Sequence, residues 1–204
     1  MTTSLVSAAI LLADHWNVPP QVIGVRWFTT ADISFNADII ISNRSLLMLS
    51  VVSFISVLIH LYSMVYMAGD AGWKRYFAML GFFTFSMHGI VLSDNLLVTF
   101  IFWELVGFSS YMLIGHWSEK PGAGRAASKA FIMNRIGDAG FLIGLMIIWT
   151  GYETFGLTTI LHSPANPWQT AASICIFCGI IGKSAQFPLF SWLPDAMEGP
   201  TPVS

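Results

Sequence analysis

Long apolar intervals separate the charged side chains of this sequence. No Asp, Glu, Lys or Arg stands in residues 45–69, 76–93 or 154–182, and residues 95–118 contain only Glu104. About 20 mainly apolar residues cross a bilayer as a helix, because a helix satisfies its own backbone hydrogen bonds in lipid. The pattern predicts five spanning helices, at about 45–68, 75–93, 95–117, 127–150 and 169–187.

The N-terminal part of the chain does not fit this pattern. Residues 1–12 are apolar but too short to cross a membrane alone, and Asp14 and Pro19 follow them. A signal peptide would have basic residues before the apolar run and a clear cleavage site, and the sequence has neither. We expect residues 1–12 to be the remnant of a transmembrane helix, and residues 13–43 to lie outside the membrane.

A weak strand pattern occurs inside this outer segment. Apolar residues alternate with other types on both sides of Asn36-Ala37-Asp38, a run of turn-forming character. They are Ile33 and Phe35 before it and Ile39 and Ile41 after it. We expect a small hairpin that turns at residues 36–38.

Composition agrees with a membrane protein. Hydrophobic residues make up 55% of the 204 residues and charged residues 10%, against about 25% charged in a typical soluble domain. The fold class that we predict is an all-α polytopic membrane protein. The net charge of −2 says little about partners, and no basic tract points to nucleic acid, which we do not expect as a partner.

Lys and Arg collect in alternate predicted loops, which indicates an orientation. The loops at 93–95 and 151–168 contain neither residue, whereas those at 69–74 and 118–126 hold or adjoin five. These five are Lys74, Arg75, Lys120, Arg125 and Lys129. Because basic loops stay inside, residues 69–74 and 118–126 are expected in the cytoplasm or matrix.

Redox or metal chemistry has little support in this chain. Cys175 and Cys178 form a C-x-x-C pair within an apolar run, but no second pair or suitably spaced histidines accompany them. We interpret them as buried apolar cysteines. No nucleotide fingerprint, phosphate loop or catalytic serine or cysteine arrangement occurs, so any electron transfer is expected on other chains.

Four charged residues fall inside the predicted spans: Glu104, Arg135, Asp138 and Lys183. A charge at the membrane centre costs roughly 2.5–3.5 kcal/mol on insertion scales, so such residues are rarely left facing lipid and mark ion pathways by default. We interpret Glu104 as a titrating carboxylate and Lys183 as its partner. Arg135 and Asp138, three apart on one helix face, could instead pair with each other and be structural.

The segment after Lys183 favours an ion path over a simple helix end. Residues 188–204 are apolar and aromatic but contain four prolines and a glycine. Irregular backbone at membrane depth is tolerated where it lines a cavity, and broken helices are common at transporter sites. The alternatives are an interfacial loop and a lysine that reaches the interface from a helix end. His60 and His88 could relay protons, but a histidine hydrogen-bonded between helices is the more frequent case.

Several motifs then occur in a recognisable order. They are DNLL at 94–97, WELVGFSSYMLIG at 103–115, KAF at 129–131, NRIGD at 134–138, and the run 182–204 from GKSAQFPL to EGPTPVS. In these motifs the chain resembles the large antiporter-like membrane subunit of respiratory complex I, chain 5, the L subunit in bacteria. The resemblance extends from about residue 25 to the end of the chain.

The resemblance implies a site and a fold. Glu104 and Lys183 match a glutamate and a lysine whose changing separation drives proton transfer in one half-channel, and Arg135 and Asp138 match charges that modulate that pair. The implied fold is an antiporter-like helical bundle, 44–204, with a discontinuous helix near 183–200. It would be partial, the first inverted-repeat unit, so we expect this chain to be a fragment.

The resemblance also implies partners and a location. The subunit would belong to a proton-translocating NADH:quinone oxidoreductase, with no cofactor on this chain; NADH, FMN, iron–sulfur clusters and quinone would bind partner subunits. Other membrane and peripheral subunits, lipid and protons are its expected partners, in a bacterial inner (plasma) membrane or else the mitochondrial inner membrane. The alternative functions are the large subunit of a multisubunit cation/proton antiporter and a non-transporting assembly subunit with inert ion pairs.

Overall fold

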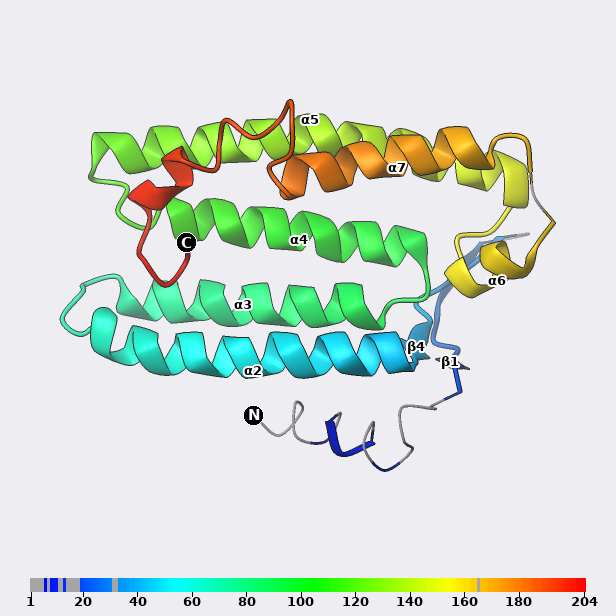
Figure 1. Ribbon diagram of the computed structural model, residues 1–204, viewed down its shortest axis with the longest axis horizontal. Helices are drawn as coiled ribbons and strands as arrows, with labels where there is room; N and C mark the ends of the chain where they lie inside the picture. The colour runs from blue at the N-terminus through cyan, green and yellow to red at the C-terminus, as the bar shows by residue number, and fades with distance from the viewer. Residues whose placement is uncertain (1–5, 7, 11–12, 14–18, 31–32, 165) are drawn as a thin grey trace.

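The computed structural model describes residues 6, 8–10, 13, 19–30, 33–164 and 166–204. Most of the predicted remnant helix at residues 1–12 lies outside these residues. Five long helices run side by side in the described part (Figure 1), in agreement with the predicted all-α fold. They are α2 (Asn43–Tyr66), α3 (Trp73–Leu92), α4 (Leu96–Ile114), α5 (Pro121–Tyr152) and α7 (Gln169–Lys183).

Four of these helices, α2 to α5, are long and apolar enough to cross a membrane. Local signals set their starts. Ser42 caps α2 and exchanges hydrogen bonds with Ser45 in a capping box, and the Asn95 side chain accepts from the backbone of Leu97 and Val98 at the start of α4. Consecutive helices pack on each other in the order α2, α3, α4, α5, and α7 lies along α5.

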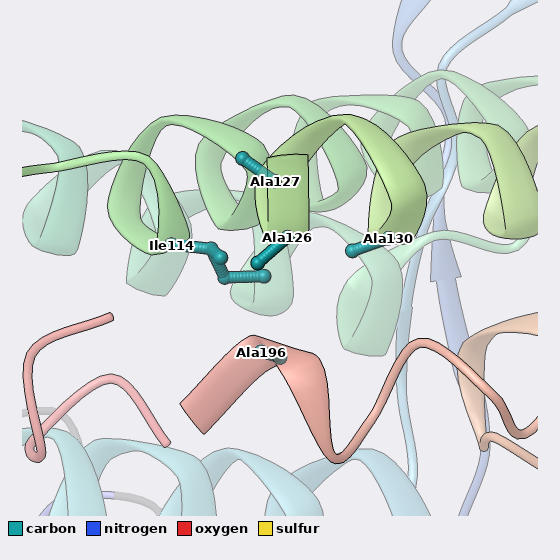
Figure 2. Close-up of a cluster of buried hydrophobic side chains, with 5 residues drawn as sticks. All are labelled: Ile114, Ala126, Ala127, Ala130 and Ala196. Carbon is teal, nitrogen blue, oxygen red and sulfur yellow. The ribbon is translucent and has the colours of Figure 1, made fainter. Parts of the chain in front are cut away.

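Helix α5 begins six residues before the predicted start at 127. Hydropathy underestimates its first turns because residues 121–129 are small or polar, yet Pro121 at the first helical position has the backbone geometry that a helix start favours. Alanines from these turns enter a buried cluster with Ile114 and with Ala196 from the segment after α7. Figure 2 shows Ala126 and Ala130 of α5 facing Ala196.

Helix α7 begins where predicted but ends at Lys183, four residues before the predicted end at 187. Its 15 residues extend about 22 Å, less than the roughly 30 Å of bilayer hydrocarbon. The helix ends at Lys183, where Ala185 takes a left-handed conformation (φ 48°) and Pro188 follows. The chain then forms turns and the short 3-10 helix η1 (Asp195–Glu198), which is the predicted break near 183–200.

The predicted hairpin turns at a different place. Strands β1 (Gln21–Ile23) and β4 (Ile39–Ile41) pair antiparallel, as do β2 (Arg26–Thr30) and β3 (Ile33–Asn36). The two ladders continue one another, so 21–41 is one interrupted hairpin closed between β2 and β3. The turn predicted at 36–38 is wrong. Ala37 donates its backbone N–H to Val25 O at 2.7 Å, so these residues bridge the two ladders.

Each end of the bundle is joined by hydrogen bonds between its loops. At one end, Asp70 of the α2–α3 loop accepts from the indole N–H of Trp117 at 2.8 Å. At the other end, Asp94 accepts from Thr158 of α6 (Leu157–His162), and Asn95 donates to Asn36 O at 2.8 Å. The α2–α3 and α4–α5 loops, which hold or adjoin the basic residues, thus lie at the same end of the bundle. This agrees with their predicted location on one side of the membrane.

Candidate functional site

The four predicted intramembrane charges lie on three adjacent helices. Glu104 is at the middle of α4, Arg135 and Asp138 are on α5, and Lys183 is the last residue of α7. Helix α5 contacts both α4 and α7, which brings the four side chains into one group. Figure 1 shows α7 ending near the middle of α5. Lys183, at the end of α7, therefore lies inside the bundle and not at its edge.

The ion pairs within this group differ from those that we expected. Arg135 Nη1 pairs with Glu104 Oε2, and Lys183 Nζ lies 3.8 Å from Asp138 Oδ2. Among the described residues, neither a Glu104–Lys183 pair nor an Arg135–Asp138 pair forms. Helix α5 places two charges one turn apart, and each finds its partner on a different neighbouring helix. Residue spacing alone could not reveal which of these charges pair with each other.

Trp103 is a member of the site that we did not single out. Its indole N–H donates to Asp138 Oδ1 at 2.7 Å, and its ring centroid lies 5.9 Å from Lys183 Nζ. One aromatic side chain therefore contacts both members of the Lys183–Asp138 pair. Its position directly before Glu104 in the WELVGF motif is the signal that could have pointed to it.

Glycines allow the charged groups to approach. A Cβ atom at Gly107 of α4 would collide with Lys183 Nζ, so a larger residue there would displace the end of the lysine side chain. A Cβ at Gly137 of α5 would lie 2.8 Å from Cys178 O and 3.2 Å from Gly182 Cα. Small residues permit such close backbone contact between membrane helices. At Gly107 the group that approaches is a side chain, not a helix backbone.

The hydrogen bonding of the site is incomplete. Among the described residues, three buried side-chain atoms lack a hydrogen-bond partner: Glu104 Oε1, Asn134 Oδ1 and Lys183 Nζ. They lie on α4, on α5 and at the last residue of α7. Buried polar groups in native proteins nearly always have partners, so these three exceptions make the charged group a candidate functional site.

The histidines lie outside this group. His88 Nε2 lies 3.0 Å from Ser53 Oγ of α2, a hydrogen bond between helices. His60 Nδ1 bonds to Ser56 O of its own helix at 2.7 Å. His116 Nε2 lies 3.2 Å from Asp70 Oδ1 in the loops. Hydrogen bonds from Trp117, then from the Gly72 backbone and His116, lower the pKa of Asp70.

Cys175 and Cys178 are unpaired and partly exposed on α7, where Cys178 packs against Gly140 of α5. The expectation that they are buried is thus only partly met. In the part of the chain that the structure describes, no group of three or more His, Cys, Asp or Glu side chains is arranged to hold a metal ion.

Solved structures show the same arrangement of helices. The chain superposes over its full length on 23% of a chain in the Mrp complex from Dietzia sp. DQ12-45-1b, with a TM-score of 0.83 and 26% identity. A chain of the archaeal membrane-bound sulfane sulfur reductase matches 99% of it with a TM-score of 0.79 at 20% identity, which supports the fold alone. The helices, the broken α7 and the buried charges thus define an antiporter-like membrane protein.

Sequence comparison places the chain in a family. Residues 93–204 match the family described as NADH:quinone oxidoreductase/Mrp antiporter, TM, and residues 27–77 match NADH-ubiquinone oxidoreductase (complex I), chain 5 N-terminus. The chain belongs to the NADH:quinone oxidoreductase/Mrp antiporter family.

Similar curated proteins carry the name NAD(P)H-quinone oxidoreductase subunit 5, chloroplastic. The protein from Physcomitrium patens is 44% identical over 187 residues, which are 87% of this chain and 26% of that protein. The protein from Mesostigma viride is 39% identical over 211 residues, 98% of this chain and 32% of that protein. The chain thus spans about a quarter to a third of these relatives.

Proposed function

We propose that this chain is part of a proton-translocating membrane subunit of an NADH:quinone oxidoreductase. The observation that carries the proposal is the group of four charges at the end of α7, two of them with unpartnered atoms, on three contacting helices. The similarity to proteins named NAD(P)H-quinone oxidoreductase subunit 5 supports the redox-linked assignment.

The proposed half-channel works by exchange of ion-pair partners. In the arrangement described, Lys183 faces Asp138 while Glu104 binds Arg135. If Arg135 leaves Glu104, the freed carboxylate attracts the Lys183 ammonium, and this opposite charge favours the protonated lysine. When Arg135 returns, Lys183 loses that partner and releases its proton more readily. Lys183 and Glu104 are the proposed proton carriers, and Arg135 and Asp138 modulate them.

The energy for this exchange would come from other subunits. We propose that NADH, FMN, iron–sulfur clusters and quinone bind partner chains and that this chain holds no redox cofactor. Coupling would be electrostatic, because each ion pair biases the next. The partners are then the other membrane and peripheral subunits of the complex.

The proposed location is a bacterial inner membrane, with the mitochondrial inner membrane as the alternative. Four apolar helices of spanning length support a multi-pass membrane protein. The similar proteins that we name are chloroplastic, which favours neither of these two membranes.

A second candidate function is cation/proton exchange without redox partners. The match to a chain of the Mrp complex, with a TM-score of 0.83, favours it. The charged group serves either function, because both require proton movement past a buried lysine. The NRIGD motif at 134–138 and the VGFSSY motif at 106–111 favour the oxidoreductase subunit.

Lys183→Met in the full-length subunit tests the proposal. Methionine keeps much of the length of the side chain and removes the charge. In membrane vesicles we expect the complex to assemble, while NADH-driven proton pumping and coupled NADH oxidation fall strongly. Lys129→Met on α5 is the control, since Lys129 pairs with Asp195 in a half-exposed surface contact.

The outcomes separate the two candidates. Pumping that requires NADH and depends on Lys183 supports the oxidoreductase subunit, whereas Lys183-dependent exchange of Na⁺ or K⁺ for protons without NADH supports the antiporter. Normal pumping by an assembled Lys183→Met complex would contradict the role given to this lysine.

A further inference from the structure

Asn134 lies on α5 one turn before Asp138, facing the same end of α7. The side chain of Asn134 is buried, with 6% of the residue exposed. A Cβ atom on Gly182, the residue before Lys183, would lie 3.7 Å from Asn134 Cα. Residues four apart share a helix face, so Asn134 and Asp138 flank the position at which α7 ends.

Only half of the Asn134 amide is used. The Nδ2 group donates to Ala130 O at 2.9 Å, within the same helix, while the buried Oδ1 atom has no partner. The orientation of the amide is determined by this bond, because reversing the amide would set two acceptor oxygens against each other. Oδ1 is therefore a fixed, unoccupied acceptor.

Lys183 has the complementary deficit. Its ammonium group can donate three hydrogen bonds, but Nζ has no hydrogen-bond partner, and its ion-pair contact with Asp138 Oδ2 is 3.8 Å long. The side chain is 14% exposed, so bulk water does not replace the missing partners. A buried donor on α7 and a buried acceptor on α5 thus both lack a partner, on two packed helices that meet at Gly182 and Asn134.

We propose that Asn134 Oδ1 is an additional, uncharged acceptor for the Lys183 ammonium, reached directly or through one water molecule. Asn134 would hold the protonated lysine at an intermediate position as it leaves Asp138 for Glu104. This inference rests on the proposed function, in which Lys183 moves between carboxylates. Asn134 is a positioning residue here, because it neither takes up nor releases a proton.

Asn134→Ala and Asn134→Ser test the proposal as a matched pair. The two replacements have nearly the same volume, but the serine hydroxyl can donate to Ala130 O, as hydroxyls in helices do, and still accept a hydrogen bond. In the full-length subunit within its complex, we expect the alanine variant to pump protons several-fold more slowly per assembled complex. Serine should restore a substantial part of the loss.

A purely structural role predicts a different result. If Asn134 only fills space, the alanine and serine variants will assemble equally and pump equally, which would overturn the proposal. Asn134→Val and Asn134→Thr repeat the comparison at larger volume if the smaller pair fails to assemble. The Asn134→Thr variant, which keeps a hydroxyl, should then pump faster than Asn134→Val. Equal rates would again contradict the inference.

Lys183→Met, measured in the same vesicles, separates failure of this inference from failure of the proposed function. Reduced pumping by Lys183→Met, together with equal pumping by the paired Asn134 variants, would contradict the role of Asn134 but support the proton path through Lys183. Unchanged pumping by Lys183→Met would contradict both the proposed function and the role of Asn134.

Discussion

The α2–α3 interface and the α4–α5–α7 group both place polar side chains between apolar helices. In the first, the polar side chains form hydrogen bonds across the interface, whereas in the second some buried polar atoms lack a hydrogen-bond partner. Between α2 and α3, Ser53 bonds to His88 and Ser63 bonds to Tyr76, each at 3.0 Å. Ser63 and Tyr76 have no exposed surface at all. These hydrogen bonds between hydroxyl, phenol and imidazole groups join the two helices where they pack.

The α4–α5–α7 group uses formal charges and leaves some of them incomplete. Lys183 and Asp138 stand 3.8 Å apart, and one carboxylate oxygen of Glu104 has no hydrogen-bond partner. A buried polar group without a partner lowers the stability of the fold. The first interface therefore serves association of the helices, whereas the second retains groups whose partners can change.

The largest effect is expected where glycine lets α5 and α7 touch. Gly137→Val inserts a side chain where even a Cβ atom would lie 2.8 Å from Cys178 O. We expect a loss of about 3 kcal/mol or more in stability, at the upper end for overpacked cores. The yield of assembled complex and its thermal unfolding midpoint measure this loss.

Gly124→Val is the control on the same helix, because a Cβ at Gly124 has no atom within 4 Å. Both variants replace a helical glycine by a β-branched residue and so share any change in helix propensity. Equal stability of the two variants would show that the α5–α7 contact does not depend on Gly137.

The second effect concerns the Glu104–Arg135 pair. Arg135→Met leaves Glu104 without its cation, and we expect a loss of roughly 2–3 kcal/mol. This is less than the about 3–5 kcal/mol of a fully buried pair, because the Arg135 side chain is 40% exposed. Adding Glu104→Gln should recover part of the stability, as a double-mutant cycle would measure. Additive losses would argue against the pair.

The third effect concerns the indole of Trp103. Trp103→Phe keeps an aromatic ring beside Lys183 but removes the N–H that Asp138 accepts at 2.7 Å. A hydrogen bond to a charged group contributes about 1.5–3 kcal/mol, so we expect slower pumping by an assembled complex. Trp168→Phe, at a 64% exposed position, should pump normally. Normal pumping by both variants would exclude Trp103 from the site.

A smaller effect is expected in the loops, outside the membrane. The pKa of Asp70 is lowered chiefly by the hydrogen bond from Trp117, so its contribution to loop stability is present above the ordinary aspartate pKa of about 4. That contribution disappears as the pH falls through the lowered value. Protection against hydrogen exchange at 67–72 and 115–120, measured relative to the intrinsic exchange rate at each pH, should therefore fall in acid, and Asp70→Asn should abolish this dependence. Persistence of the acid effect in Asp70→Asn would assign it elsewhere.

The smallest effect is expected at the α2–α3 interface. Ser53→Ala removes the hydroxyl that bonds to His88, and interhelical hydrogen bonds in membranes average about 0.6 kcal/mol. We expect a slight drop in thermal stability and unchanged proton pumping. A strong loss of pumping in a stable complex would show that the α2–α3 interface, like the α4–α5–α7 group, takes part in proton transfer.

Some parts of the fold could be predicted from sequence because they depend on local composition. The apolar intervals located α2, α3 and α4 to within a few residues, and the prolines after Lys183 located the broken segment. The start of α5 was placed too late, because small and polar residues form its first turns and no hydropathy signal marks them.

The strand pairing and the ion pairs could not be predicted in the same way. Alternation near residues 33–41 indicated strands, but their partners lie in 21–30, beyond the range of a local turn rule. Glu104 and Lys183 were expected to pair, yet each has a nearer partner on α5. The choice depends on how the helices rotate and how closely glycines let them approach.

Hydrophobicity and charge are properties of each segment taken alone, and they were enough to predict a membrane protein with charges inside its spans. The family could also be read from ordered motifs. Three-dimensional packing was needed to show that α7 stops after 15 residues, that Trp103 contacts Lys183, that Asn134 lies beside Gly182, and that Arg135 binds Glu104. Those facts depend on distances between helices, which arise only when their backbones pack together.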